Sequence, residues 1–374
     1  MDFSKAHQLN FIAQELGSAI PTLVLFTEAG RRFTDGHATI GCQFGRNRMK
    51  KVLSIDAGGI RGIIPAIILA EIETRARRPI SNLFDFFAGT STGGMLVLGL
   101  NRPDPTNCLR PLCSATEVGW LFHEWGNRAF GKELSKADRP IAERSPEHGI
   151  EEMFREYFGN TRLSRSLRPT MVTAFDLVRG RPFFFNSAQA ARNNNADAFM
   201  WQAARATTAV PRYFAPFRLP VSLAPFLDNH EACLVDGSLF AGNPAMCALA
   251  EARALFPEEE DFLFISLGCG EVSRGLSPVD DLHKMKRRLL DCSLTAQSAC
   301  ADYQMRAFLP VQRYIRIQPE LMPGFDRIDD TSRDYLLSME RVARETIVRY
   351  SKVLDYIVDL IAPDPVEHFE LDVA

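Results

Sequence analysis

The sequence predicts an α/β protein with a largely parallel central sheet flanked by helices, and with a mainly helical C-terminal portion. Three observations favour this class. Short apolar runs typical of buried strands alternate with longer segments in which apolar residues recur every three to four positions. Strands that alternate with helices form parallel sheets covered on both faces. Apolar residues make up 46% of the 374 positions, enough for a sizeable core.

The pattern becomes clear from Met49 onward. "KVLSI" (51–55) predicts a short buried strand that ends in a glycine turn, and the apolar spacing of residues 63–77 predicts a helix. "LFDFFAG" (83–89) predicts a second strand, and residues 92–101 open a second helix. These two strand–helix pairs follow each other closely, as expected of neighbours in a parallel sheet.

Later segments continue the alternation with less regular spacing. Strands are expected at 169–177, 232–238 and 262–268, and helical segments at 243–255, 280–308 and 332–361. The proline-rich stretch 101–116 and the arginine-rich stretch 160–169 are the best loop or insertion sites. No second core is visible.

Composition excludes several classes of protein. The net charge of −3 and the pI near 6.2 do not suggest a basic surface for nucleic acid. No segment reaches the roughly 18–20 apolar residues that span a bilayer, and the N-terminus lacks a secretory signal pattern. The eight cysteines form no CxxC pair and no zinc-type spacing, so we expect reduced thiols, a cytoplasmic location and no metal.

"GTSTGG" (89–94) is the strongest local motif. It fits G-x-S-x-G with Ser91 at the centre, after a predicted strand and before a predicted helix. A serine on so sharp a turn needs small neighbours, here Gly89 and Gly93, and its hydroxyl is lifted clear of the sheet. The helix that starts there favours developing negative charge. We interpret Ser91 as a nucleophile, the alternative being a plain tight turn.

"IDAGGIRG" (55–62) could supply the hydrogen-bond donors that a nucleophilic serine requires nearby. Attack on an ester produces an oxyanion, which needs preorganised N–H donors. Gly58 and Gly59 can offer backbone N–H groups with no side chain in the way, and Arg61 would add a fixed positive charge. The alternatives are a glycine turn without function and a phosphate-binding turn, although the standard phosphate-loop spacings are missing.

The base is the harder assignment. Among the seven histidines, His230 in the loop "LDNHEA" is the best candidate, and His123 is more typical of a packed helix residue. Asp236 in "LVDGSLFAGNP" instead follows an apolar strand and precedes Gly237, which is the kind of turn that presents a side chain. Both His230 and Asp236 stay open at this point.

Taken together, these motifs resemble the patatin-like phospholipase family. The sequences "DAGGIRG", "GTSTGG" and "DGS" match its oxyanion segment, nucleophile turn and aspartate turn in the family's order, and "ATTAVPRYFAPF" (206–217) is similar to it as well. The resemblance implies a Ser-Asp dyad of Ser91 and Asp236 without a catalytic histidine. It also implies an oxyanion hole at Gly58 and Gly59, an acyl-enzyme intermediate, and hydrolysis of acyl esters in membrane phospholipids or galactolipids, with no cofactor.

The resemblance covers roughly residues 49–320, which we expect to form the catalytic domain. Residues 1–48 are a poorly patterned extension, and residues 321–374 are a helical portion expected to pack on the same domain. Ala57 departs from the family by replacing the first glycine of the run. It keeps its N–H, but a left-handed backbone there would cost about 1–2 kcal/mol.

Two other functions remain open. A patatin-like fold could serve as a binding or signalling module with weakened activity, and a Ser-His-Asp esterase could use His230. Aromatic clusters at 181–186 and 211–217 could line an acyl pocket, although core packing is the preferred interpretation. The expected partner is a membrane lipid at the bilayer surface, with no transmembrane span.

Overall fold

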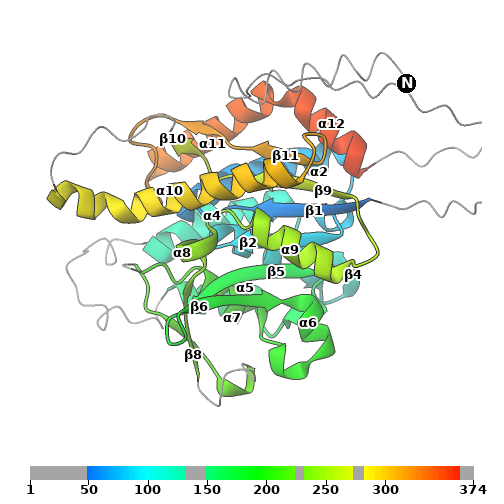
Figure 1. Cartoon of the computed structure of the whole chain (residues 1–374), viewed down its shortest axis with the longest axis vertical. Helices are drawn as coiled ribbons and strands as arrows, with labels where there is room; N and C mark the ends of the chain where they lie inside the picture. Colours follow the sequence, from blue (N-terminus) through cyan, green and yellow to red (C-terminus); the bar gives the residue numbers. More distant parts are fainter. Residues whose placement is uncertain (1–48, 131–148, 212, 224–230, 273–281, 363–374) are drawn as a thin grey trace, which may run out of the picture.

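A central eight-stranded sheet organises the protein. The computed structural model describes residues 49–130, 149–211, 213–223, 231–272 and 282–362 (Figure 1). The strands of the sheet are β1 (Lys50–Ile55), β2 (Phe86–Thr90), β5 (Thr170–Asp176), β6 (Arg181–Asn186), β7 (Phe217–Leu219), β8 (Ala232–Asp236), β9 (Phe262–Leu267) and β11 (Tyr314–Ile317). Their order is β11-β9-β1-β2-β5-β8-β7, and β6 pairs with β5 outside this path.

The sheet is largely parallel, as predicted. Parallel pairs join β11, β9, β1, β2 and β5 in that order. By contrast, β6 and β8 run antiparallel to β5, and β7 runs antiparallel to β8. Two small pairs lie outside the sheet: β3 (Pro103–Asp104) with β4 (Asn107–Pro111), and β10 (Glu271–Val272) with β12 (Glu320–Leu321).

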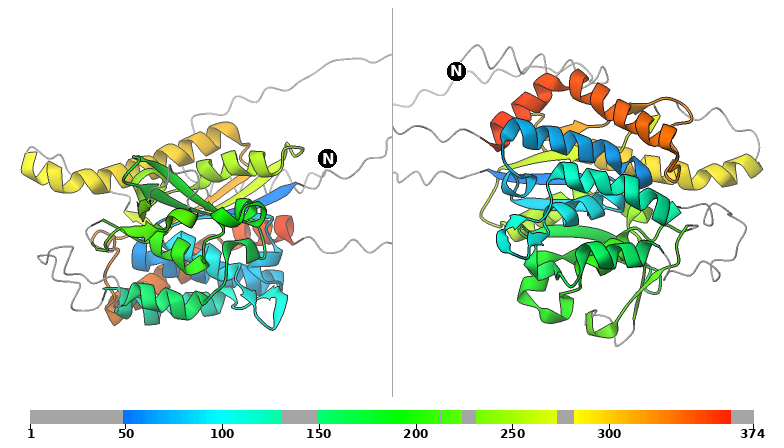
Figure 2. Two further views of the ribbon diagram at one scale, coloured as in Figure 1. Left: turned by 90° about the horizontal axis from the view of Figure 1, so that it is seen from below. Right: turned by 180° about the vertical axis from the view of Figure 1, so that it is seen from behind.

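Helices cover both faces of the sheet. They are α2 (Ile63–Ala76), α3 (Thr92–Leu100), α4 (Ala115–Phe130), α5 (Ile150–Phe158), α6 (Ser187–Arg192), α7 (Met200–Thr207), α8 (Ser238–Ala241), α9 (Ala245–Leu255), α10 (Leu282–Phe308), α11 (Arg333–Arg349) and α12 (Ser351–Ile361). Figure 1 places α8, α9 and α10 in front of the sheet. Figure 2 shows α2, α4, α11 and α12 on the opposite face.

The core has one hydrophobic cluster on each side of the sheet. On β1, Val52 belongs to the cluster under α9, while the next residue, Leu53, belongs to the cluster under α2. Successive side chains of a strand point to opposite faces, so a strand covered on both sides must be apolar at every position. This requirement explains why "VLSI" and "FLFISL" read as continuous apolar runs.

The strands and helices predicted after Met49 are present, although the stretch 101–116 expected as a loop carries the β3–β4 hairpin and the start of α4, and the C-terminal portion differs in detail. The single helical segment expected at 332–361 is two helices, because Tyr350 leaves helical geometry between α11 and α12. The turn lets Val353 and Leu354 enter the same core cluster as Met339. The aromatic run 181–186 forms an edge strand, which the interpretation as core or pocket wall had not identified.

The helices beyond residue 320 pack against the first elements of the described chain. Helix α11 packs on α2, and Lys51 Nζ donates a hydrogen bond of 2.7 Å to the carbonyl of Ile361 at the end of α12. Within the ranges given above, no helix combines the length and apolar character needed to cross a membrane.

Candidate active site

Ser91 occupies a strained turn between β2 and α3. Its backbone has φ 55° and ψ −123°, and only Ser91 and Arg77 among the described non-glycine residues have a positive φ. Such a conformation costs a side-chain-bearing residue about 1–3 kcal/mol and persists only where the surroundings enforce it. The Ser91 N–H donates to Thr207 Oγ1 at 2.8 Å, a contact that fixes the turn from α7.

The glycines that frame Ser91 are required by close backbone contacts. A Cβ on Gly93 would lie 2.2 Å from the carbonyl oxygen of Ile55, and a Cβ on Gly89 would lie 2.3 Å from that of Gly93. Both are far inside van der Waals contact with main-chain atoms that cannot easily move. The turn therefore presses against the end of β1, which brings Ser91 next to the glycine segment that follows β1.

Strand β5 brings Asp236 and Ser91 together, because it pairs both with β2, which precedes Ser91, and with β8, which ends at Asp236. Thr90, the last residue of β2, pairs with Thr173, and Asp236, the last residue of β8, pairs with Ala174. Because Thr173 and Ala174 are consecutive, the two strand ends meet at one level of the sheet. Thr90 strengthens this junction, since its Oγ1 lies 2.7 Å from Thr173 Oγ1 and 2.6 Å from the carbonyl of Ala241.

The Asp236 carboxyl is completely buried. Burial raises its pKa from 3.8 to about 6, while the nearby Ser91 hydroxyl and hydrogen bonding by Ser238 oppose the shift. Oδ1 accepts a bond of 2.7 Å from the Ser238 N–H, but Oδ2 has no partner that meets ordinary hydrogen-bond geometry. Ser91 thus lies close enough to affect the carboxyl without a formed bond. A buried oxygen left open beside a hydroxyl is well placed to accept its proton.

The glycine segment after β1 forms a tight turn beside Ser91. Gly59 has φ 57°, starts the short 3₁₀ helix η1 (Gly59–Gly62), and lines the same pocket as Ser91. Within the described part of the chain, the Gly58 N–H has no hydrogen-bond acceptor, whereas the Ala57 N–H donates to the Gly242 carbonyl at 2.8 Å. Ala57 is not left-handed, so the expected strain at this position is absent and its N–H is already used.

Arg61 contacts one carbonyl oxygen of the glycine segment and one between β9 and β10. Its Nε lies 3.4 Å from the Gly58 carbonyl, and its Nη1 donates to the Gly270 carbonyl at 2.9 Å. Fixing the Gly58 carbonyl also fixes the N–H of Gly59, because both belong to one planar peptide group and point in opposite directions. The guanidinium therefore acts on the orientation of this peptide.

An apolar pocket opens at Ser91. It encloses about 450 Å³ of space outside the atoms, including the part open to solvent. Its apolar walls come from Met95, Phe122, Ile150, Met153, Val210 and Phe214. Phe214 belongs to one of the two aromatic clusters considered from sequence. The other cluster, on β6, does not line this pocket.

The structure separates the described histidine candidate from the site. His123 Nε2 lies 3.1 Å from Glu340 Oε1, a contact between α4 and α11, and no histidine is among the described residues that line the pocket around Ser91. His230 falls outside the described residues. No group of three or more histidine, cysteine, aspartate or glutamate residues in the described segments could hold a metal ion.

Sequence reasoning missed the role of α7 and the chain that follows it. Thr207 binds the backbone of Ser91, and Thr208, Val210 and Phe214 line the pocket. The stretch "ATTAVPRYFAPF" contains all four residues. Its aromatic part, 211–217, was considered from sequence as a pocket wall, but residues 206–210 were noted only for their similarity to the family. Its signal was a run of small and hydroxyl residues directly before a proline and aromatics, which gave no indication of what it contacts.

Comparisons with known proteins agree on one family. The family model for patatin-like phospholipase matches residues 53–249, more than half of the chain and a range that contains Gly58, Ser91 and Asp236. Patatin-like protein 2 of Oryza sativa subsp. indica is 28% identical over 79% of this chain and 83% of its own length. Patatin-17 of Solanum cardiophyllum is 30% identical over 60% of this chain and 61% of its own length.

A solved structure, VipD from Legionella pneumophila, is 12% identical and covers 80% of this chain and 67% of that one, with a TM-score of 0.29. That score is too low to add to the description of the fold. The family match and the shared length with plant patatins are sufficient without it. This chain belongs to the patatin-like phospholipase family.

Proposed function

We propose that the protein hydrolyses acyl esters of membrane phospholipids or galactolipids with a Ser91-Asp236 dyad. The observation that carries this proposal is the meeting of the strained Ser91 turn and the buried Asp236 carboxyl at consecutive positions along β5. Asp236 has a pKa of about 6, so at neutral pH it is mostly ionised yet more basic than an ordinary aspartate. That combination suits a general base.

In the first half-reaction, Ser91 Oγ attacks the acyl carbonyl carbon while Asp236 accepts the hydroxyl proton. The N–H groups of Gly58 and Gly59 donate to the oxyanion, with Arg61 holding the peptide that carries one of them. The ester C–O bond then breaks, and the alcohol leaves with the proton from Asp236. Water next attacks the acyl-enzyme with Asp236 again as base, which releases the fatty acid and restores Ser91.

The apolar pocket supports an acyl chain as the group bound beside Ser91. Its walls offer methionine, isoleucine, valine and phenylalanine side chains, and its polar lining includes Ser91, Thr92 and Thr208. Apolar walls with a few convergent polar groups are typical of sites for apolar ligands. The headgroup of the substrate would then lie outside the pocket, against the protein surface around its opening.

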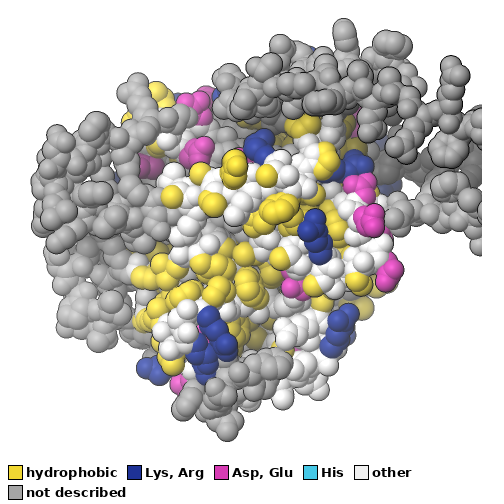
Figure 3. Space-filling view, viewed as in Figure 1, with side chains coloured by type: hydrophobic (Ala, Val, Ile, Leu, Met, Phe, Trp, Pro, Cys, Tyr) yellow, Lys and Arg dark blue, Asp and Glu magenta, His cyan; other side chains and the backbone are white. Residues whose placement is uncertain are grey.

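An exposed apolar surface supports contact with a lipid layer. Figure 3 shows hydrophobic side chains gathered over α8, β5 and β6, with Lys and Arg side chains beside them. At the turn between β5 and β6, Leu177 is 47% and Val178 is 66% exposed, and Phe184 on β6 is 39% exposed. This turn follows the C-terminal half of β5, in which Ala174 pairs with Asp236, so an apolar contact there would lie on the active-site side of the sheet.

Hydrolysis of phosphatidylcholine vesicles and of a soluble short-chain ester tests the function directly. We expect wild type to release fatty acid from both, faster from vesicles, and Ser91→Ala to release none. Leu177→Ser/Val178→Ser should slow only the vesicle reaction, whereas Val348→Ser, a change of a still more exposed apolar residue on α11, should slow neither. Absence of hydrolysis by folded wild type would favour a binding module.

We further propose that residues 49–320 form the catalytic domain and that residues 321–374 pack on it. The Ile60 N–H donates to the Ile328 carbonyl at 2.9 Å, so the C-terminal portion supports the glycine segment. A chain that starts at Met49 should retain its activity and melting temperature. An inactive or insoluble product would mean that residues 1–48 are part of the domain.

Free thiols support a reducing location for the protein. The cysteines whose side chains the structure describes, Cys108, Cys113, Cys233, Cys247, Cys269 and Cys300, are free thiols, and reduced thiols are typical of cytoplasmic proteins. We propose a cytoplasmic protein that meets membranes from the water side, which fractionation of cells in low and high salt would test.

A further inference from the structure

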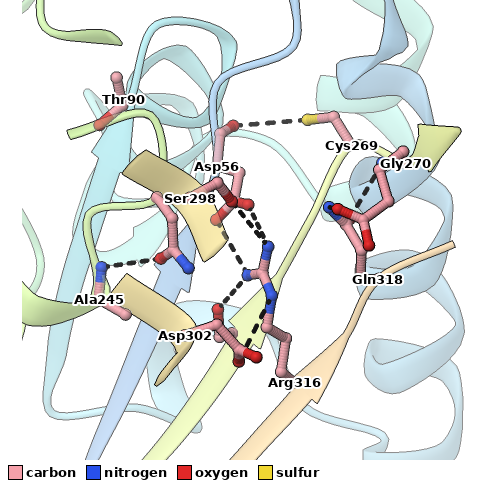
Figure 4. Close-up of polar contacts among 12 residues, drawn as sticks. Asp56, Thr90, Ala245, Cys269, Gly270, Ser298, Asp302, Arg316 and Gln318 are labelled. Atoms are coloured by element: carbon pink, nitrogen blue, oxygen red, sulfur yellow. Dashed lines mark hydrogen bonds and ion pairs between the residues drawn. The ribbon is translucent and has the colours of Figure 1, made fainter. Parts of the chain in front are cut away.

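A buried ion pair lies directly before the glycine segment. Arg316 on β11 binds Asp56 through two nitrogens, with Nη2–Oδ2 at 2.6 Å and Nη1–Oδ1 at 3.2 Å (Figure 4). Asp56 is 4% and Arg316 is 7% exposed. Arg316 is oriented in turn by Ser266 Oγ at 2.8 Å, and Asp302 Oδ1 on α10 lies 3.8 Å from its Nε.

Asp56 begins the turn that offers the oxyanion donors, residues 56–59, which we call the oxyanion turn. Asp56 carries the only polar side chain among these four residues, since the others are Ala57, Gly58 and Gly59. The main chain is held on one side by the Asp56 N–H to the Leu267 carbonyl at 3.0 Å. The Asp56 carboxylate is therefore the only polar side chain of the oxyanion turn through which the rest of the protein can orient the peptide groups of the turn.

A gain in folding stability does not by itself explain why a buried Asp56–Arg316 ion pair is present. Removing two charges from water costs several kcal/mol per ion, and apolar replacements of buried pairs are often neutral or stabilising. Burial raises the pKa of Asp56, and Arg316 opposes that shift by its charge and hydrogen bonds. The planar guanidinium instead fixes the orientation of Asp56, because two parallel hydrogen bonds hold the plane of its carboxylate.

A comparable Arg–Asp pair lies at the other end of β11. Arg313, just before β11, binds Asp261, just before β9, with both distances at 2.6 Å. That pair is partly exposed and lies a full strand length from Ser91. It offers a matched control, because it involves the same strand β11 and the same arginine–aspartate chemistry but touches no residue of the oxyanion turn.

We propose that Arg316 is a positioning residue that acts through Asp56 to hold the Gly58 and Gly59 N–H groups in the direction needed for the oxyanion. This inference rests on the proposed function. Arg316 lies outside the segment 53–249 that the family model matches, so the family match itself does not assign it. The role predicts an effect on the transition state rather than on substrate binding, since the oxyanion exists only after attack.

The test compares Arg316→Lys with Arg313→Lys. Lysine keeps the charge but replaces the planar fork by a single ammonium. We expect Arg316→Lys to lower kcat for a soluble ester by about 10-fold or more, with KM changed by less than about 2-fold. Arg313→Lys should leave both constants near wild type. An unchanged kcat in folded Arg316→Lys, or an equal loss in Arg313→Lys, would overturn the proposal.

Hydrogen exchange provides a readout that does not depend on catalysis. We expect the peptide covering residues 55–62 to exchange faster in Arg316→Lys than in wild type, and not in Arg313→Lys. If wild type hydrolyses nothing, the proposed function fails, while this exchange comparison still decides whether Arg316 positions the turn; equal exchange in both variants would refute it. Should Arg316→Lys not fold, Ser266→Ala, which removes one bond to Arg316, should lower kcat by a few-fold without a change in KM.

Discussion

The two turns that meet at β5 resemble each other in outline and differ in where they store free energy. Each follows a strand of the central sheet and leads into a helix. At the Ser91 turn the backbone itself is strained, with φ 55° on a residue that has a side chain. At the Asp236 turn the backbone is ordinary, since Gly237 has φ −66°, and the cost lies in a carboxylate buried without solvent.

The difference teaches that nucleophile and base are prepared by different physics. Dihedral strain at Ser91 does not depend on pH and can be relieved by changing the backbone preference of one residue. Desolvation at Asp236 depends on ionisation, so its cost appears only where the carboxyl is charged. Experiments that separate these two costs therefore test the proposed dyad without relying on activity alone.

Loss of either member of the dyad should give the largest effect. Ser91→Ala and Asp236→Asn should each lower hydrolysis of one phospholipid by at least about 10³-fold, and the double variant should be no worse, because the pair acts as a unit. The measurement is initial rate, with circular dichroism to confirm folding. His123→Ala, at a contact with Glu340, should keep most activity. A folded, inactive His230→Ala beside an active Asp236→Asn would favour the triad instead.

Asp236→Asn should also stabilise the protein at neutral pH. The folded pKa of about 6 is above the unfolded value of 3.8, so the folded state binds the proton more tightly and wild type loses stability as pH rises from about 4 to about 6. Above pH 6 this loss corresponds to roughly 3 kcal/mol, an upper figure from about 2 pKa units.

Denaturant unfolding of wild type and Asp236→Asn at pH 4 and pH 8 measures this effect. Asparagine can still accept the bond from the Ser238 N–H, so the variant should gain on wild type at pH 8 and far less at pH 4. An equal difference at both pH values would show that Asp236 is not a desolvated acid.

Ser91→Gly should relieve the other kind of strain by a smaller amount. A φ near 60° with ψ near −120° is readily adopted by glycine, as at the first central position of a type II′ turn. We expect a gain of about 1 kcal/mol in the free energy of unfolding that is the same at pH 4 and pH 8. The control is Ser238→Gly in the Asp236 turn, which begins an ordinary helix and should lose stability. A loss in both variants would contradict the strain assigned to Ser91.

Ala57→Gly should have the smallest effect. Ala57 is not left-handed, and its N–H is bonded to the Gly242 carbonyl, so glycine relieves nothing and frees no donor. Ester hydrolysis should stay within about 2-fold of wild type. A large rise in kcat would mean that Ala57 restrains the oxyanion turn, and a large loss would mean that its methyl group is required.

The local parts of this site follow directly from the amino-acid sequence. A strand, a glycine-framed serine and a helix start lie within about 15 consecutive residues, and steric limits on neighbouring backbone atoms decide their conformation. The same holds for the paired glycines after β1. These features are encoded next to each other, and short-range sterics need no knowledge of the rest of the chain.

How these parts meet is set by contacts between segments that are distant in the sequence. Asp236 comes level with Ser91 because β8 runs antiparallel to β5, and a strand's direction in the sheet is not written in its apolar pattern. Thr207, Ile328 and Arg316 contact the site from positions far along the chain, and the sequence around each of them does not indicate its partner. Such contacts depend on the packing of the whole core. Each one contributes little free energy by itself, so no local sequence pattern predicts which residues will meet.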